Sequence, residues 1–240
     1  MKTLGIMVDC SRNAVMKPEK VKEFAKIISD MGYNMLQLYT EDTYEITGEP
    51  FFGHMRGRYS QEELKDIDAY CTSVGIELVP CIQVLAHLNQ LKLWEPYVNL
   101  FDCHDILLVG DEKVYTLIDE MFATLEKCFT SRRVNIGMDE AHFLGRGKYQ
   151  DLHGYRDRVE ILTEHLARVK EIANKHGFTL MMWSDMFIRL HNQGEYYGEN
   201  IKIPETTIDR VPEGVELIYW DYYSKDKEHY DHMLKTHQDF

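Results

Sequence analysis

The chain has 240 residues, 44% of them hydrophobic, and a formal net charge of −13. This length supports one sizeable core and leaves little for a second, so residues 1–240 are expected to form a single domain. The strong negative charge repels phosphate groups and argues against nucleic acid and anionic membrane surfaces as partners. A neutral glycan is compatible with this charge.

The sequence also indicates a cellular compartment. Five cysteines occur without any Cys-x-x-Cys spacing, an odd number that favours free thiols in a reducing environment. The first apolar stretch, residues 4–8, is too short for a signal peptide and is ended by Asp9. No apolar run is long enough to span a bilayer. We therefore expect a cytoplasmic protein, and the sequence leaves a homo-oligomer open.

Short apolar runs alternate with amphipathic helical patterns along the chain. The first helix begins at Pro18, where a missing N–H costs nothing, and ends before Gly32. The second follows a capping box formed by Ser60 and Glu63. The hydrophobic periodicity predicts strands at 4–8, 34–38, 76–82, 134–136, 179–183 and 215–220, and later helices at 112–129, 159–176 and 225–240.

This alternation predicts parallel strands joined by right-handed crossovers. The connections after strands are long and those after helices are short, as in a (β/α)8 barrel of the TIM type. A doubly wound sheet would need a glycine-rich turn after the first strand, but residues 9–13 contain no glycine. Six strand–helix units are predicted instead of eight. We expect a barrel truncated at its C-terminal end; completion by a partner chain, or unrecognised strands within 103–109, are the alternatives.

The most informative motif is Asn-Ile-Gly-Met-Asp-Glu at 135–140. Asp139 and Glu140 directly follow an apolar strand, and this end of a parallel barrel carries the active site. The alternative interpretation is an acidic helix N-terminus, where carboxylates complement the helix dipole.

Polar and aromatic residues follow the other predicted strands as well. Each is weak alone, because single histidines and tryptophans at such positions usually belong to the core. Their shared position at one end of the strands supports a common site, formed by Arg12, residues 39–42, His87, Trp183, Asp185, Trp220 and Tyr222.

These motifs, taken in order, resemble glycoside hydrolase family 20, the β-N-acetylhexosaminidases. The matching segments are Gly-Met-Asp-Glu at 137–140, Asp-Cys-Ser-Arg at 9–12, Trp183 and Trp220. The resemblance implies a barrel enzyme that removes terminal β-linked N-acetylglucosamine or N-acetylgalactosamine from the non-reducing ends of glycans. It implies retaining, substrate-assisted catalysis, in which the 2-acetamido group of the substrate replaces a protein nucleophile. Neither a cofactor nor a metal is implied.

The resemblance also implies individual roles. Glu140 would be the general acid and would have to remain protonated at the working pH. Asp139 would hold the acetamido nitrogen and stabilise the oxazolinium charge. Arg12 would bind sugar hydroxyls, and His87 would support the acid. Trp183 and Trp220 would wall the pocket, while Asp185 and Tyr222 are assigned to substrate binding by strand position only.

The sequence departs from the family pattern at several points. Asn135 stands where the family commonly has histidine, and Met138 where it has glycine. The tyrosine that orients the acetamido group and one pocket tryptophan usually lie on strands seven and eight, which are absent here unless Tyr222 or Tyr223 substitutes for the tyrosine. We therefore predict a divergent subgroup, and weak binding or inactivity for a chain of this length.

Three other functions stay open from the residues alone. A metal-dependent sugar-processing barrel would need histidine and carboxylate ligands from several strands, but no His-x-His pair occurs. A non-catalytic glycan-binding barrel would retain the fold without turnover. A two-carboxylate retaining glycosidase would need Asp185 or Asp221 about 5 Å from Glu140.

Overall fold

The computed structural model describes all residues except 1, 13, 198–200, 202 and 238–240. Its main sheet has six parallel strands, and spatial neighbours follow one another in chain order. These strands are β1 (Gly5–Asp9), β2 (Met35–Glu41), β3 (Glu77–Ile82), β6 (Arg133–Asn135), β7 (Thr179–Trp183) and β8 (Val215–Ile218). This is the winding of a (β/α)8 barrel, over six of its eight strands.

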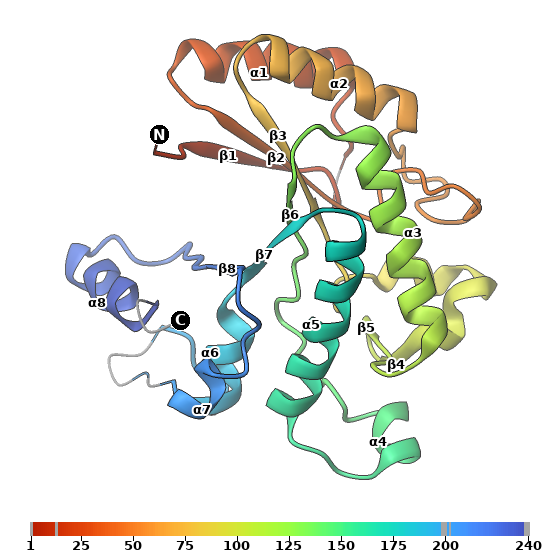
Figure 1. Ribbon diagram of the computed structural model, residues 1–240, viewed down its shortest axis with the longest axis vertical. Helices are drawn as coiled ribbons and strands as arrows, with labels where there is room; N and C mark the ends of the chain where they lie inside the picture. The colour runs from red at the N-terminus through yellow and green to blue at the C-terminus, as the bar shows by residue number, and fades with distance from the viewer. Residues whose placement is uncertain (1, 13, 198–200, 202, 238–240) are drawn as a thin grey trace.

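Long helices cover one face of this sheet (Figure 1). They pack in sequence, each against the next, which is the outer layer expected for a barrel. These helices are α1 (Pro18–Asp30), α2 (Gln61–Ser73), α3 (Glu112–Cys128) and α5 (Arg158–Lys175). Shorter helices lie in or after the later connections: α4 (Lys148–His153), α6 (Asp185–His191), α7 (Glu205–Ile208) and α8 (Lys227–His237).

The two-residue period of the strands separates an outer face from an inner one. Leu36 and Leu78 face outward into the main core with the helices. The neighbouring positions Met35 and Val79 form a small separate cluster with Met181 on the inner face. The same period, continued from Val79 to the carboxyl end of β3, places Gln83 on the inner face.

The predicted starts of the first two helices are confirmed, whereas the last helix begins at Lys227 and not at 225. Pro18 is the first residue of α1. The Ser60 side chain accepts a hydrogen bond from the backbone N–H of Glu63, whose own side chain accepts one from the N–H of Ser60, so that two otherwise unpaired donors are satisfied. Local sequence alone therefore fixes where these two helices begin.

The long connection after β3 contains structure that the sequence did not predict. It holds two 3-10 helices, η1 (Asn89–Leu93) and η2 (Glu95–Leu100), and two short strands, β4 (Phe101–Cys103) and β5 (Ile106–Leu107). These strands pair only with each other, antiparallel. Strands therefore do occur near residues 103–109, but they do not extend the barrel sheet.

Some predicted boundaries were wrong by a few residues. The strand predicted at 34–38 continues to Glu41, with a register shift against β3 between Tyr39 and Glu41. The strand predicted at 215–220 ends at Ile218. The predicted end of the last helix, at 240, lies outside the described residues.

Two further expectations concern the whole chain. All five cysteines are free, as predicted, and only Cys103 is not buried. No helix among the described residues has the length and apolar character required to cross a membrane.

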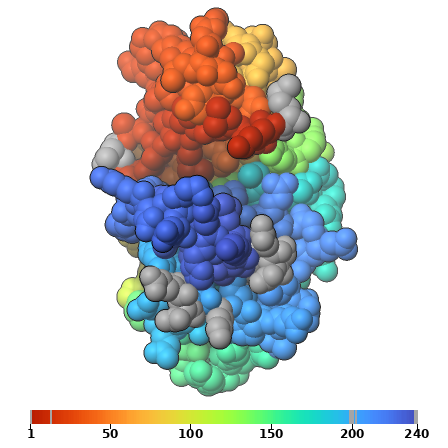
Figure 2. Space-filling view, turned by 90° about the vertical axis from the view of Figure 1, so that its left-hand side faces the viewer, coloured from red at the N-terminus to blue at the C-terminus, as the bar shows by residue number. Residues whose placement is uncertain are grey.

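The segment from α7 to α8 occupies the middle of the face in Figure 2, where it is blue, next to the red N-terminal residues.

Candidate active site

The two adjacent carboxylates lie on a tight turn that follows β6, residues 137–140, which we name the acid turn. Gly137, Met138 and Glu140 all have positive φ, at 70°, 68° and 53°. This region is costly for residues with a side chain, and it persists where the surroundings hold it in place. Such an outlier at the carboxyl end of a barrel strand indicates a functional turn.

Side chains from three strands hold the backbone of the acid turn. Asn135 accepts from the N–H of Gly137 at 3.0 Å, at the end of β6 itself. Gln83, just after β3, accepts from the N–H of Met138 at 3.1 Å. Asp185, just after β7, accepts from the N–H of Glu140 at 3.1 Å. The strands on both sides of β6 therefore fix the direction of the two carboxylates.

His87 joins the two carboxylates. Its Nε2 lies 3.2 Å from Oδ2 of Asp139 and 3.5 Å from Oε2 of Glu140. His87 has a φ of 61°, and its backbone N–H donates to Asp105 at 3.2 Å. Burial by itself lowers the pKa of His87, but the hydrogen bond to Asp139 and its charge outweigh burial and raise that pKa.

Arg12 lies on the opposite side of the His87 ring. Its guanidinium contacts Nδ1 of His87 at 3.1 Å and donates from Nε to Glu41 at 3.0 Å. A guanidinium can only donate, so Nδ1 accepts, the proton sits on Nε2, and Nε2 donates to Asp139. Burial raises the pKa of Glu41, and Arg12 opposes this shift.

These contacts close into a ring of hydrogen bonds. Gln83 donates from Nε2 to Oδ1 of Asp139 at 2.7 Å and to the hydroxyl of Tyr39 at 3.0 Å. Tyr39 donates in turn to Glu41 at 3.1 Å. Each bond of this hydrogen-bond ring joins a donor to an acceptor, and its members are Asp139, Gln83, Tyr39, Glu41, Arg12 and His87.

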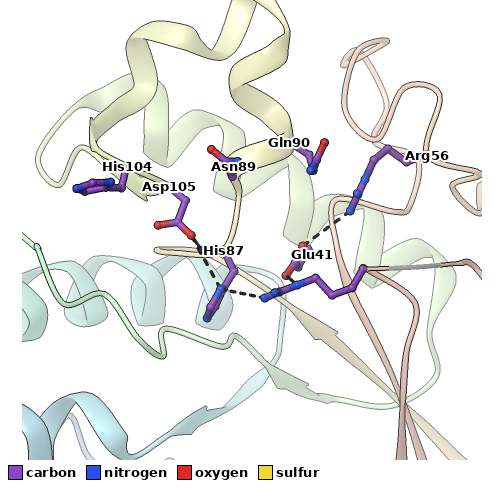
Figure 3. A pocket seen from close by; sticks show the side chains of 8 residues that line it. Glu41, Arg56, His87, Asn89, Gln90, His104 and Asp105 are labelled. Atoms are coloured by element: carbon purple, nitrogen blue, oxygen red, sulfur yellow. Dashed lines mark hydrogen bonds and ion pairs between the residues drawn. The ribbon is translucent and has the colours of Figure 1, made fainter.

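A cavity of about 460 Å³ lies on the Nδ1 side of His87. Figure 3 shows His87 with Glu41 on one side and Asp105 on the other, and Arg56 across the opening. Most of the lining is polar, formed by Arg12, Glu41, Arg56, His87, Asn89, Gln90, His104 and Asp105. This size and the many hydrogen-bonding groups suit a polar small molecule such as a sugar.

The two carboxylates differ in access to solvent. The Glu140 side chain is 41% exposed and that of Asp139 is 16% exposed. Asp139 uses one oxygen for Gln83 and the other for His87. Glu140 is therefore free to reach a ligand, while Asp139 is held at a fixed position beside it.

Asp185, predicted to bind substrate, has no exposed surface. Burial raises the pKa of Asp185 to about 7, and the charge of Asp139 adds to this rise. Arg189 forms an ion pair with it at 3.4 Å. The structure places this carboxyl behind the acid turn, where it contacts the backbone of Glu140.

The aromatic residues divide into two groups. Trp183 ends β7 beside the acid turn, and its backbone N–H donates to the carbonyl of Gly137 at 3.1 Å. Trp220 instead packs against Tyr196, with ring centres 5.2 Å apart. Tyr222 is 83% exposed and contacts Trp220 at 5.6 Å. Within the described residues, Trp183 alone of the three has a direct contact with the acid turn in the structure.

Sequence reasoning missed several parts of this site. Gln83 and Asp105 were not singled out, and Glu41 was noted only as one of several residues at a strand end. Gln83 could have been found as the first residue after β3, on the inward-facing positions of that strand. No sequence signal identifies Asp105, because it reaches His87 through a loop between two short strands.

A cation could also be held by part of this group. Donor atoms of His87, Asp139 and Glu140 all lie within 4.8 Å of one another. In the structure His87 and Asp139 share a hydrogen bond, and Oε2 of Glu140 lies 3.5 Å from Nε2 of His87. The arrangement keeps the metal-dependent alternative testable.

Comparison with known proteins identifies the family. The sequence profile of the catalytic domain of glycosyl hydrolase family 20 matches residues 4–205. This chain belongs to that family. The match confirms the resemblance seen in the motifs around Arg12 and the acid turn.

Curated relatives and solved structures agree with this assignment. Hexosaminidase D of Homo sapiens is 22% identical over 228 residues, which cover 88% of this chain and 43% of that protein. A beta-hexosaminidase of Akkermansia muciniphila is 24% identical over 228 residues, covering 80% of this chain and 46% of that protein. The chain thus spans less than half the length of these two relatives.

The fold comparison extends over almost the whole chain. The exo-β-N-acetylglucosaminidase of Vibrio harveyi, solved with N-acetylglucosamine, matches with a TM-score of 0.73 and 18% identity, over 92% of this chain and 38% of that one. The β-N-acetylhexosaminidase of Bacteroides fragilis matches with a TM-score of 0.71 and 21% identity, over 97% and 46%. The predicted TIM-type barrel fold is therefore confirmed.

Proposed function

We propose that the protein is a β-N-acetylhexosaminidase that removes terminal non-reducing N-acetylglucosamine or N-acetylgalactosamine from glycans. The observation that carries this proposal is the pair on the acid turn. Asp139 is fixed by bonds at both oxygens, and Glu140 beside it is partly open to solvent. Membership of family 20 supports the same reaction.

The geometry suits two separate roles for the two carboxylates. Glu140 gives its proton to the glycosidic oxygen as the bond to the anomeric carbon breaks. The carbonyl oxygen of the 2-acetamido group forms the new bond to that carbon, and Asp139 accepts the N–H of the resulting oxazolinium. Water then attacks the same carbon, the bond from that carbon to the acetamido oxygen breaks, and water gives one proton to Glu140, which restores both the acid and the 2-acetamido group.

The contacts of the nearby acids argue against a protein nucleophile. Asp185 is fully buried and already accepts from the N–H of Glu140. Asp221 accepts from the Tyr219 hydroxyl with one oxygen and from two backbone N–H groups with the other. Neither carboxylate is free to attack a sugar, so the acetamido group of the substrate is the better candidate.

Arg12 and His87 are proposed to bind the sugar and to support the acid. Arg12 is 56% exposed at the edge of the cavity, although Glu41 anchors it. Trp183 is proposed to form a wall beside the acid turn. Trp220 and Tyr222 would complete the pocket only if the segment after β8 turns toward it on binding.

The test is hydrolysis of aryl β-N-acetylglucosaminide against the plain β-glucoside, on the longest available form of the protein. Turnover of the acetamido substrate alone supports the proposal. Equal turnover of both would contradict substrate assistance and favour a protein nucleophile. Binding of N-acetylglucosamine without turnover would favour a glycan-binding barrel, and loss of turnover in chelator would favour the metal-dependent alternative.

A further inference from the structure

Gln83 has a combination of contacts that no other described side chain shares. It is fully buried and lies on the inner face, just after β3. Its carbonyl oxygen accepts from the N–H of Met138, and its amide nitrogen donates to Asp139 and to Tyr39. One side chain therefore holds both the backbone of the acid turn and the carboxylate that the turn carries.

The orientation of this amide follows from its partners. The N–H of Met138 can only donate, so it needs the carbonyl oxygen of Gln83. The amide nitrogen of Gln83 then donates one N–H to Oδ1 of Asp139 and the other to the hydroxyl of Tyr39. Turning the amide over would place two acceptors together at Asp139 and two donors together at Met138.

The space around Gln83 is closed. A Cβ atom at Gly137 would lie 2.1 Å from Oε1 of Gln83, so this position in the acid turn can carry no side chain while Gln83 stays in place. Met138 itself is fully buried. Because Gln83 is fully buried, a partner group that lost its hydrogen bond to this amide would be left unpaired, at a cost in free energy.

We propose that Gln83 is a positioning residue, which holds Asp139 in place by a partner that does not titrate. This inference rests on the proposed function and deepens it. An amide donates in the same way at acidic and alkaline pH, whereas a carboxyl in its place would donate only while protonated. Gln83 therefore keeps Asp139 directed at the acetamido nitrogen over the whole working range of pH.

The hydrogen-bond ring gives this role a second consequence. Gln83 also donates to Tyr39, which donates to Glu41, the anchor of Arg12. The residue that positions Asp139 thus also orients the group that holds the sugar-binding arginine. Removing the amide opens the ring at two adjacent bonds.

The experiment compares two variants at this position. Gln83→Leu removes all three polar contacts at similar volume, and kcat for aryl β-N-acetylglucosaminide is expected to fall on the order of 10²-fold at every pH, with KM changed by less than about threefold. Gln83→Glu keeps the acceptor for Met138 but puts a carboxyl beside Asp139. It is expected to keep most of kcat at acidic pH, where the two acids share a proton, and to lose it as pH rises and both ionise.

Gln37→Leu is the matched control. Gln37 is a buried glutamine on β2 with no hydrogen bond to the acid turn in the described structure: it contacts Met35 and, at 3.4 Å, the Nδ2 of Asn135, whereas the Oδ1 of Asn135 is the atom that holds the N–H of Gly137. It is expected to lower stability by a similar amount and to leave kcat within about threefold and the pH profile unchanged.

The outcomes separate this inference from the proposed function. If wild type hydrolyses the acetamido substrate and folded Gln83→Leu has the same kcat, the positioning role is overturned and the proposed function stands. If the pH profile of kcat for Gln83→Glu runs parallel to that of wild type, the requirement for a partner that does not titrate is overturned. Absence of wild-type turnover on the acetamido substrate would overturn the proposed function and this role with it.

Discussion

The acid turn after β6 and the segment after β8 both lie past the carboxyl end of a strand, yet the side chains that they carry are held in different ways. In the acid turn, the backbone N–H groups of Gly137, Met138 and Glu140 each meet a side-chain oxygen from β6 or from just after β3 or β7. Backbone N–H groups of the segment after β8 also donate, to Tyr196 and Asp221, but the side chains of Trp220 and Tyr222 are held by contacts between rings. Hydrogen bonds restrict distance and angle, whereas ring contacts allow several arrangements. The first region can therefore fix a reacting group, while the second suits adjustable contact with a sugar.

The two regions also differ in how deeply their side chains are buried. Asp185 and Gln83, which support the acid turn, are fully buried. Tyr222 and Tyr223 are among the most exposed large side chains described. Substitutions in the first region should change kcat and stability, and those in the second should change mainly KM.

The largest effect is expected for Glu140→Gln. The amide keeps the shape of the side chain but has no proton to give to the leaving group, so kcat on an N-acetylglucosamine disaccharide should fall by about 10² to 10⁴-fold. Steady-state kinetics measure this. Glu19→Gln, at the exposed start of α1, is the control and should be indistinguishable from wild type. A fall of less than tenfold would remove Glu140 from the role of general acid.

Gly137→Ala tests how rigidly the acid turn is held. Its Cβ would lie 2.1 Å from Gln83, at a φ of +70°. Gly75→Ala is the matched control, because Gly75 also has positive φ, at +79°, but no atom within 4 Å of its Cβ.

The control should lower the free energy of unfolding by about 1 kcal/mol. Gly137→Ala should lower it by about 2 kcal/mol more, because the packing around it has to move. Urea unfolding measures both values. Equal losses in the two variants would mean that Gln83 moves aside without cost.

Asp185→Asn should reveal the burial of this carboxyl through the pH dependence of stability. Burial raises the pKa of Asp185 from 3.8 to about 7. The unfolded chain then ionises first, so Asp185 destabilises the fold increasingly as pH rises from about 4 to 7. Asparagine removes this penalty and still offers an oxygen to the N–H of Glu140.

The variant should therefore gain stability relative to wild type by about 2 to 3 kcal/mol more at pH 8 than at pH 5. Urea unfolding at the two pH values measures the difference. If the variant and wild type differ in free energy of unfolding by the same amount at both pH values, Asp185 does not titrate in the folded protein over this range.

The smallest effect is expected for Tyr222→Ala. With 83% of its surface exposed, this side chain contributes little to the fold, and the free energy of unfolding should change by less than about 0.5 kcal/mol. Its kcat should equal that of wild type. A rise in KM above about threefold would show that the segment after β8 reaches the sugar and would bring the two regions into one site.

The sequence determined the strand order, the barrel winding and the family. Each depends on short-range patterns: apolar runs with a period of two or 3.6, Pro18 and the Ser60 capping box, and the order of motifs along the chain. It also placed Arg12, His87 and the acid pair at one end of the strands, because the ends of parallel strands share one face of a barrel.

Only the tertiary structure decided how these residues meet. Gln83 bonds to Tyr39 on β2 and to Asp139 after β6, and Glu41 on β2 bonds to Arg12 after β1; no local pattern specifies such partners. Asp185 looked like a residue open to the sugar because it directly follows a strand, but the sharp turn into α6 buries it. Secondary structure follows from neighbours in sequence, whereas the direction of a side chain in this site depends mainly on hydrogen bonds between distant parts of the chain, such as those of Asp139 with Gln83 and His87.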